Sequence, residues 1–314
     1  LTQGAVVALY NYMSQILVEL IKLANLIINI TKSVACGRRI QSALESGTPT
    51  ESGVEENGFE GYRYAVEFRH TSLAYRNNSE NSLTDIDFAA EQGSTVGIIG
   101  GTGSGKTSLV NMIGRFYEAT EGGVYVDGLN VKDYKLPALR EKIGIVPQKA
   151  VLFKGTIRDN LLWGNENATD EELFAALELA QAREIVEKKE GGLDSEIEQG
   201  GRNLSGGQRQ RLTIARALVK KPEILILDDS ASALDFATDA ALRKALKTLK
   251  NTTVFIVSQR TSSIRHADKI VVLDDGAAAG IGTHDELLES CSVYREIYES
   301  QFRKEDNRKG GESA

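Results

Sequence analysis

The sequence Gly100-Gly101-Thr102-Gly103-Ser104-Gly105-Lys106-Thr107 is a glycine-rich stretch between two apolar segments. The segment before it, Val96–Ile99, is a short apolar run of the kind that forms a strand buried on both faces. The segment after it places Leu109, Met112 and Ile113 at helical spacing. A strand, a glycine-rich loop and a helix in this order predict a phosphate-binding loop, or P-loop.

The residue types of this loop suit a nucleotide triphosphate. Glycines let successive backbone N–H groups approach phosphate oxygens, and the N-terminus of the following helix adds its positive end. Lys106 is predicted to reach the β- and γ-phosphates, and the Thr107 hydroxyl is predicted to coordinate Mg²⁺. The residues that we expect to contact the nucleotide here are Gly100, Thr102, Gly103, Ser104, Gly105, Lys106, Thr107 and Ser108.

Two further apolar runs, Ile224–Leu227 and Val254–Val257, follow downstream and are separated from the first by helical patterns. Continuous apolar runs that alternate with helices are typical of a parallel sheet buried on both faces. Asp228 comes directly after the first of these runs. A carboxylate at the tip of a buried strand is where a P-loop enzyme places a direct or indirect partner of Mg²⁺.

Other patterns surround this predicted core. Val66 and Phe68, and later Ile86 and Phe88, alternate with polar residues, which predicts half-buried antiparallel strands. Residues 170–188 carry apolar side chains at helical spacing and predict a helical insertion. The fold class is therefore α/β, a P-loop NTPase core (RecA-like) with an antiparallel β subdomain and a helical subdomain.

Leu204-Ser205-Gly206-Gly207-Gln208 lies upstream of Asp228 and opens another helical pattern. By itself this segment is a Ser-Gly-Gly turn that caps a helix. In series with the P-loop and Asp228 it resembles the signature motif of the ABC ATPase family. The resemblance implies that Ser205, Gly207 and Gln208 contact the γ-phosphate of a nucleotide held by a second subunit, in a head-to-tail dimer.

Other family positions follow in the same order. Tyr75 resembles the aromatic residue that stacks on adenine, and Gln148 resembles the loop glutamine that senses Mg²⁺ and couples to a membrane domain. Asp235 ends a segment similar to the interfacial D-loop and is expected on the nucleotide as well. The resemblance covers residues 65–301.

Segments 152–160 and 198–202 are similar to exporters in particular. The resemblance to exporters implies ATP and Mg²⁺ as cofactors, with Thr107, Gln148 and Asp228 as the residues that hold the metal. It also implies a transmembrane domain, of this chain or of its partner, that the ATP-binding domain drives.

Two positions depart from the family. The family normally follows the strand-end aspartate with a glutamate that polarises the attacking water, and this chain has Asp229, which is one methylene shorter. The strand 254–258 should lead to a histidine that orients this water, and this chain has Gln259, which carries no proton at neutral pH. A carboxylate that lies about 1 Å farther from the water can lower the rate of hydrolysis about 10²-fold. We expect a site that binds ATP and hydrolyses it slowly, with Asp229, Gln259 and Gln148 at its catalytic positions.

This combination resembles one subunit of the heterodimeric bacterial multidrug exporters, in which one site is degenerate and the other competent. The intact signature motif would then complete the partner's hydrolytic site. Two alternatives stay open. One is a homodimeric exporter ATPase in which Asp229 suffices as the base, and the other is a soluble ABC ATPase that acts on nucleic acid. The formal net charge of −7 speaks against the second.

The N-terminal stretch 5–30 is mostly apolar. As a helix it would be about 39 Å long, and a bilayer core is about 30 Å thick. Lys32, Arg38 and Arg39 follow it, which predicts that everything after the helix lies on the cytoplasmic side of the cell membrane. The polar residues within the stretch recur every three or four positions and are expected to face water or protein: Asn11, Gln15, Glu19, Lys22, Asn25 and Asn29. The alternative is an amphipathic helix on a soluble core.

We expect four parts along the chain. They are the end of the last transmembrane helix with its cytoplasmic extension (1–44), a linker (45–61), the nucleotide-binding domain (62–302, with the helical subdomain at 149–203) and a disordered tail (303–314). Cys36 and Cys291 show neither metal-ligand nor disulfide spacing, which fits a reducing compartment. The first residue is Leu1 and no signal-peptide pattern follows, so we expect a piece of a longer protein.

Overall fold

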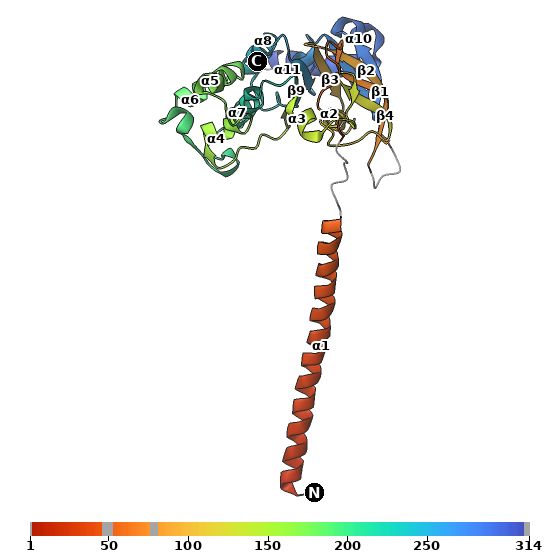
Figure 1. The fold of residues 1–314 in the computed structure, drawn as a ribbon, viewed down its shortest axis with the longest axis vertical. Coiled ribbons are helices and arrows are strands. Elements are labelled where there is room, and N and C mark those ends of the chain that lie inside the picture. Colours follow the sequence, from red (N-terminus) through yellow and green to blue (C-terminus); the bar gives the residue numbers. More distant parts are fainter. Residues whose placement is uncertain (1, 46–52, 76–80, 311–314) are drawn as a thin grey trace. The chain divides into compact units, whose positions relative to one another are not determined.

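The structure is a computed structural model that describes residues 2–45, 53–75 and 81–310. The chain divides into two compact units, Leu1–Glu51 and Ser52–Ala314 (Figure 1). Each unit is described by itself.

The first unit is one continuous helix, α1 (Gln3–Glu45). Among the described residues it is the one helix long and apolar enough to cross a membrane by length and composition. Its two charged residues within the apolar stretch form an ion pair, Lys22 Nζ to Glu19 Oε1 at 2.7 Å, one turn apart. This pairing lowers the cost of placing either charge in a nonpolar surrounding.

The second unit is built on a six-stranded sheet in the order β12-β11-β3-β10-β9-β6. The three predicted apolar runs form its adjacent central strands, which pair in parallel as expected. The strands are β3 (Thr95–Gly100), β6 (Ile143–Val146), β9 (Ile224–Asp228), β10 (Thr253–Val257), β11 (Lys269–Asp274) and the antiparallel edge strand β12 (Ala277–Gly282).

Successive residues of the central strands belong to two different hydrophobic clusters. On β3, Ile98 packs in one cluster and Ile99 in the other, and neither is exposed to solvent. Phe255 and Ile256 on β10 divide in the same way. Because neighbouring side chains of a strand point to opposite faces, the sheet is covered on both sides, as the continuous apolar runs predict.

A second sheet has the order β2-β1-β4-β5 and is antiparallel. Its strands are β1 (Tyr64–Ala74), β2 (Asn81–Glu91), β4 (Glu121–Val126) and β5 (Leu129–Asn130). Phe68 lies opposite Phe88, and their rings stack with centroids 4.9 Å apart. The predicted alternation is confirmed over 86–88. In β1 it is wrong, because Glu67 is buried between Val66 and Phe68 and its carboxylate accepts hydrogen bonds from Tyr62 and Arg69.

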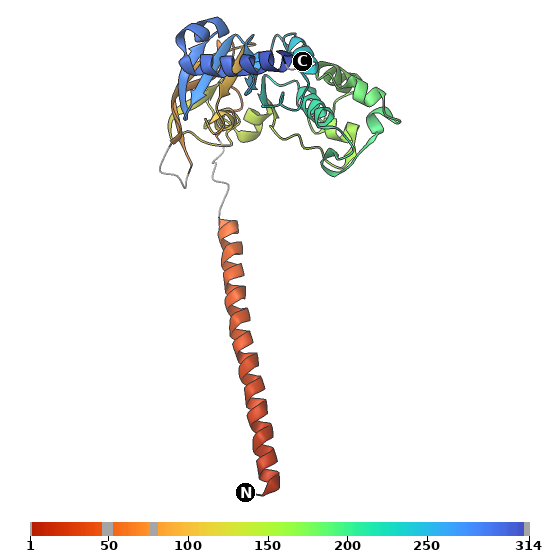
Figure 2. The same ribbon diagram turned by 180° about the vertical axis from the view of Figure 1, so that it is seen from behind.

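Helices cover these sheets. Those outside the helical subdomain are α2 (Lys106–Ile113), α3 (Leu136–Glu141), α8 (Phe236–Leu246), α9 (Thr261–Ile264), α10 (His284–Ser290) and α11 (Ser292–Gly310). Figure 2 shows the blue helix α11 running along the domain toward its helical end. The side chain of Tyr294 anchors this helix in the core, because it is fully buried.

The helical subdomain lies at the end of the domain opposite β1, β2 and β4 (Figure 1). It contains α4 (Ile157–Leu162), α5 (Asp170–Leu179), α6 (Arg183–Glu187), α7 (Gly206–Val219), two short 3₁₀ helices (Gly192–Asp194 and Gln199–Gly201) and the hairpin of β7 (Gly155–Thr156) with β8 (Glu196–Ile197). The predicted insertion 170–188 is two helices. The chain breaks between them because Gln181 adopts a left-handed φ of 56°.

Three segments differ from the expected boundaries. The helical subdomain, expected at 149–203, also includes α7, which packs against α4 and α5. The predicted linker 45–61 includes residues 46–52, which lie outside the described residues. Its later part bonds to the domain, with Gly53 N–H donating to the Tyr134 carbonyl and Phe59 N–H to the Asp127 carbonyl. Helix α11 continues to Gly310 within the predicted tail, and residues 311–314 lie outside the described part. Polar composition alone does not exclude a helix, since Arg, Lys and Glu are good helix formers.

Phe255→Ala should lower the free energy of unfolding by about 3–5 kcal/mol, because it empties a fully buried position of the central strand. Urea unfolding of the full chain in detergent, followed by circular dichroism, measures this loss. Phe236→Ala is the matched control and should cost less than about 1 kcal/mol, since the Phe236 side chain is 63% exposed. Equal losses at the two positions would contradict the assignment of Phe255 to the core.

Candidate functional site

The P-loop joins β3 to α2 at the carboxyl edge of the main sheet. Gly103 and Gly105 adopt positive φ angles of 87° and 93°, which only glycine takes without strain. Gly105 is the N-cap of α2 and offers no side chain to the first amides of the helix. These amides therefore remain available to an anion, as the sequence predicts.

Lys106 folds back over the loop that precedes it. Its Nζ atom donates to the Gly100 carbonyl at 3.0 Å and lies 3.3 Å from Ser104 Oγ. Burial lowers the pKa of Lys106, and the nearby carboxylates Asp229 and Asp228 oppose this shift. The structure thus holds a half-buried cation against backbone oxygens at the place where phosphates are expected.

Thr107 and Asp228 meet although 121 positions separate them in the sequence. The Thr107 hydroxyl donates to Asp228, with Oδ2 at 3.0 Å and Oδ1 at 3.2 Å. Burial raises the pKa of Asp228, while the bond from Thr107 lowers it. A hydroxyl and a carboxylate are oxygen ligands of the kind that Mg²⁺ prefers, so this pair fits the predicted metal position.

This pair needs further ligands to hold a metal ion. Among the described residues, no group of three or more His, Cys, Asp or Glu side chains lies close enough to bind a metal. A Mg²⁺ ion between Thr107 and Asp228 would complete its coordination with phosphate and water oxygens and with the amide oxygen of Gln148, the third predicted ligand.

Asp229 follows directly and adopts a left-handed φ of 46°. Its Oδ2 atom accepts a long hydrogen bond of 3.4 Å from Gln148 Nε2. Burial raises the pKa of the Asp229 carboxyl, and the bond from Gln148 together with the charges of Lys106 and Arg260 lowers it. The structure therefore brings Gln148 and Asp229 together, as the sequence predicts for two of the catalytic positions.

Gln259 lies on the loop after β10, beside these residues. The sheet register pairs Val257 with Asp228, and the Asp229 N–H donates to the Val257 carbonyl at 2.9 Å. Gln259 follows Val257 by two residues and its side chain is exposed. The two positions that depart from the family thus come from the ends of neighbouring strands.

Tyr75 follows β1, and its hydroxyl lies 2.7 Å from Ser108 Oγ in α2. Its ring meets the edge of Tyr117, with centroids 5.1 Å apart. The structure therefore places the predicted adenine-stacking residue next to the P-loop helix. Tyr117 is a neighbour that sequence reasoning missed, because a single tyrosine after a helix carries no motif.

The signature segment forms the start of α7. Ser205 Oγ accepts from the Gln208 N–H at 3.2 Å, and the Ser205 N–H donates to Gln208 Oε1 at 2.9 Å. This capping box satisfies both residues within the segment, and in the part of the chain that the structure describes neither of them bonds to the P-loop. Gly207 approaches the D-loop instead, since a Cβ on it would lie 3.3 Å from the Ala233 carbonyl oxygen.

Asp235 is the N-cap of α8 rather than a free carboxylate. Its Oδ1 atom accepts from the Thr238 N–H at 2.8 Å, and its Oδ2 atom accepts from the Thr238 hydroxyl at 2.8 Å. These bonds hold the pKa of Asp235 below its usual range. Farther back in the D-loop, Ser232 Oγ donates to the Asp229 carbonyl at 2.8 Å, so the D-loop is tied to a predicted catalytic position.

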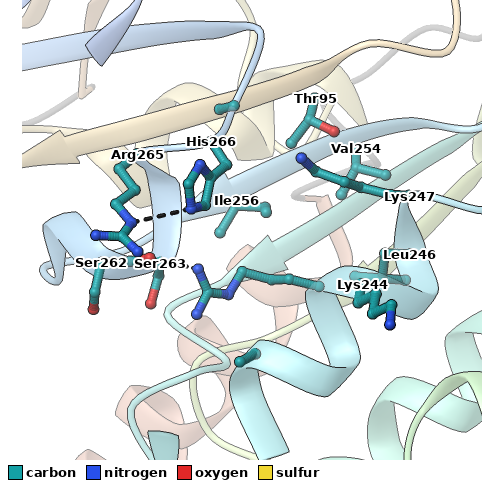
Figure 3. A pocket seen from close by; sticks show the side chains of 13 residues that line it. Thr95, Lys244, Leu246, Lys247, Val254, Ile256, Ser262, Ser263, Arg265 and His266 are labelled. Carbon is teal, nitrogen blue, oxygen red and sulfur yellow. Dashed lines mark hydrogen bonds between the residues drawn. The ribbon is translucent and has the colours of Figure 1, made fainter. Parts of the chain in front are cut away.

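The three histidines lie elsewhere, as expected. His70 pairs with Asp85 and Asp87 on the antiparallel sheet, and His284 bonds to the Tyr294 hydroxyl. His266 lines a separate cavity of about 380 Å³ between α8, α9 and the central strands (Figure 3). There it accepts a hydrogen bond from Arg265, which faces it in the figure.

Three comparisons agree with this geometry. The family profile described as ABC transporter matches residues 83–232. The chain is 43% identical over 303 residues to YfiB of Bacillus subtilis, an uncharacterized ABC transporter ATP-binding protein, covering 96% of this chain and 52% of that protein. It is 37% identical over 302 residues to YgaD of the same organism, provisionally named a multidrug export ATP-binding/permease protein, covering 96% and 52%.

A solved structure of a bacterial Atm1-family ABC exporter with ATP bound has a TM-score of 0.79 and 31% sequence identity to this chain. The similarity covers 87% of this chain and 48% of the exporter chain. The chain thus spans about half the length of the curated relatives it matches. Residues 83–232 belong to the ABC transporter family and form its ATP-binding domain, which is of the ATPase class.

Proposed function

We propose that this chain is the ATP-binding half of an exporter subunit whose own site retains MgATP and hydrolyses it slowly. In this proposal the chain forms a head-to-tail dimer with a different ABC subunit. It supplies its signature motif to the competent site of that partner. The observation that carries the proposal is the contrast between an intact phosphate-binding loop and two altered positions beside it, Asp229 and Gln259.

The phosphate-binding part has the geometry that retention requires. The first amides of α2 are not capped by Gly105, Lys106 lies over the loop, and Thr107 meets Asp228 at 3.0 Å. Tyr75 stands beside Ser108 at the same helix. These contacts support binding of a nucleotide with Mg²⁺, in which Thr107, Asp228 and Gln148 would hold the metal.

The water-handling part supports slow hydrolysis. A general base must lie within hydrogen-bond reach of the water it activates. Asp229 carries its carboxylate one methylene closer to the backbone than a glutamate would, and Gln148 Nε2 holds that carboxylate. Gln259 replaces a side chain that can bear a proton with one that cannot. ATP bound here would therefore act as a long-lived clamp between the subunits.

The signature segment supports service to a partner. Ser205 is exposed and its capping box with Gln208 presents the N-terminus of α7 without using the P-loop of the same chain. A helix N-terminus that carries free amides binds phosphate well. We propose that Ser205, Gly207 and Gln208 complete the hydrolytic site of the second subunit, with Asp235 near the same interface.

The membrane location and the cargo are also part of the proposal. Helix α1 is long and apolar enough to span a bilayer, and its basic flank favours the cytoplasmic side for the ATP-binding domain. The provisional name of YgaD supports the efflux of small, drug-like molecules. A nucleic-acid substrate is disfavoured by the net charge of −7.

Lys106→Ala should abolish retention of nucleotide on this chain, because it removes the cation that faces the phosphates. Ser205→Ala should leave that retention within about twofold and lower turnover at the partner's site by at least about tenfold. Photolabelling of the complex with 8-azido-ATP, with the two chains separated on a gel, measures retention on each chain.

Thr169→Ala is the matched control for Ser205→Ala, since Thr169 caps α5 in the same subdomain with the same kind of capping box. This variant removes a comparable helix cap, which lowers the free energy of unfolding by about 1 kcal/mol, and it does not change a predicted phosphate site. Equal effects of Ser205→Ala on both chains would exclude the proposed division of roles.

The double variant Asp229→Glu, Gln259→His should raise steady-state phosphate release by about 10²-fold over wild type when the chain is expressed without a partner. It restores the longer carboxylate and the proton-bearing side chain at an otherwise intact site. A wild type that already turns over at the rate of the double variant would favour the homodimeric ATPase instead.

A further inference from the structure

Gln301, on α11, bonds to three groups of the loop that carries Gln259. Its Nε2 atom donates to the Gln259 carbonyl at 2.7 Å. Its Oε1 atom accepts from the Thr261 N–H at 2.9 Å and from the Thr261 hydroxyl at 3.0 Å. The Gln301 side chain therefore bonds to the residues on both sides of Arg260, which precede it by 42 and 40 positions in the sequence.

The position of Gln301 is fixed by the helix that carries it. Tyr294, Ile297 and Gln301 share one face of α11, since they follow each other at helical spacing. Tyr294 is fully buried in the core and its hydroxyl lies 2.8 Å from His284 Nδ1, while Ile297 packs against the same core. This face holds α11 against the domain and directs Gln301 to the loop.

The loop needs this partner because its own residues leave groups unsatisfied. Thr261 begins α9, and the N-cap residue of that helix, Arg260, makes no side-chain cap. Thr261 is 1% exposed, so its N–H and hydroxyl have no access to water. A buried donor without a partner destabilises the fold, and the Gln301 amide oxygen removes this cost for both groups.

The residue before Gln259 is fixed as well. The Ser258 N–H donates to the Ile98 carbonyl at 3.0 Å, and Ser258 Oγ accepts from the Arg260 N–H at 3.0 Å. Gln259 is thus the exposed member of a short loop whose backbone is held by β3 on one side and by Gln301 on the other. Fixed backbone around an exposed side chain is what a contact to a ligand requires.

We propose that Gln301 is a positioning residue that sets the loop so that Gln259 reaches the terminal phosphate of bound ATP. The inference rests on the proposed function, which places Gln259 among the water-handling residues of the site, and it adds that Gln259 contacts the γ-phosphate. It makes α11 a part of the nucleotide site, although the helix lies far from the P-loop in sequence. Loss of the Gln301 side chain should then affect recognition of the γ-phosphate and leave recognition of the rest of the nucleotide intact.

Affinities for the non-hydrolysed analogue AMP-PNP and for ADP, both with Mg²⁺ and the full chain in detergent, test this proposal. Gln301→Ala should weaken the binding of AMP-PNP about five- to tenfold and the binding of ADP less than about twofold. This difference corresponds to one lost hydrogen bond to phosphate. Gln259→Ala should give the same split. The double variant Gln259→Ala, Gln301→Ala should bind AMP-PNP no more weakly than either single variant, because both substitutions remove the same contact to phosphate.

Ser300→Ala is the matched control, since Ser300 is the exposed neighbour and its hydroxyl donates to the Ile297 carbonyl of its own helix. It should change neither affinity. Gln301→Glu keeps an acceptor for Thr261 and loses the donor to the Gln259 carbonyl, so its effect should lie between wild type and Gln301→Ala.

Hydrogen–deuterium exchange supplies a readout that does not involve nucleotide. Gln301→Ala should speed exchange of the Thr261 amide by at least about tenfold, whereas Ser300→Ala should not. Unchanged exchange, equal weakening of both nucleotides, or additive losses in the double variant would each overturn the positioning role. Fast hydrolysis by wild type, together with a selective loss of AMP-PNP binding in Gln301→Ala, would contradict the proposed slow turnover. The same result would still support Gln301 as a positioning residue.

Discussion

The site depends on the parallel order of β3, β10 and β9 in the main sheet. Parallel strands end at the same edge, so the residues that follow them are brought together whatever their distance in the sequence. The hydrogen bond between Thr107 and Asp228 is the direct evidence of this arrangement. Gln148, Asp229 and Gln259 stand around it because each follows a strand of the same sheet. A change in strand order would separate them all.

Much of this arrangement could be predicted from the sequence, because its signals are local. The glycines of the P-loop, the unbroken apolar runs and the cap at Ser205 each report on a few neighbouring residues, and the structure confirms the elements they predict. Asp228 could be placed for the same reason, since it directly follows a recognisable strand. The roles of the residues around it are implied by the resemblance to the ABC ATPase family, which rests on several motifs in series.

The remainder could not be predicted because it depends on contacts between distant side chains. Gln301 carries no motif, and its three partners are recognised only when α11 is seen beside α9. The division of 170–188 follows from one left-handed residue, Gln181, which a helical period does not reveal. Residues 53–59 have the composition of a linker, yet their backbone groups find partners on the domain surface.

The bonds of Gln301 also impose an order on the assembly of the domain during translation. The P-loop leaves the ribosome first, and β9 and β10 can pair beside it while later residues are still being added. The loop of Gln259 then exists without the partner that caps α9. It gains that partner only after β12 and α10 have been made and α11 has docked. With the role proposed for Gln301, a nascent chain would acquire a place for phosphate before it could distinguish a triphosphate from a diphosphate.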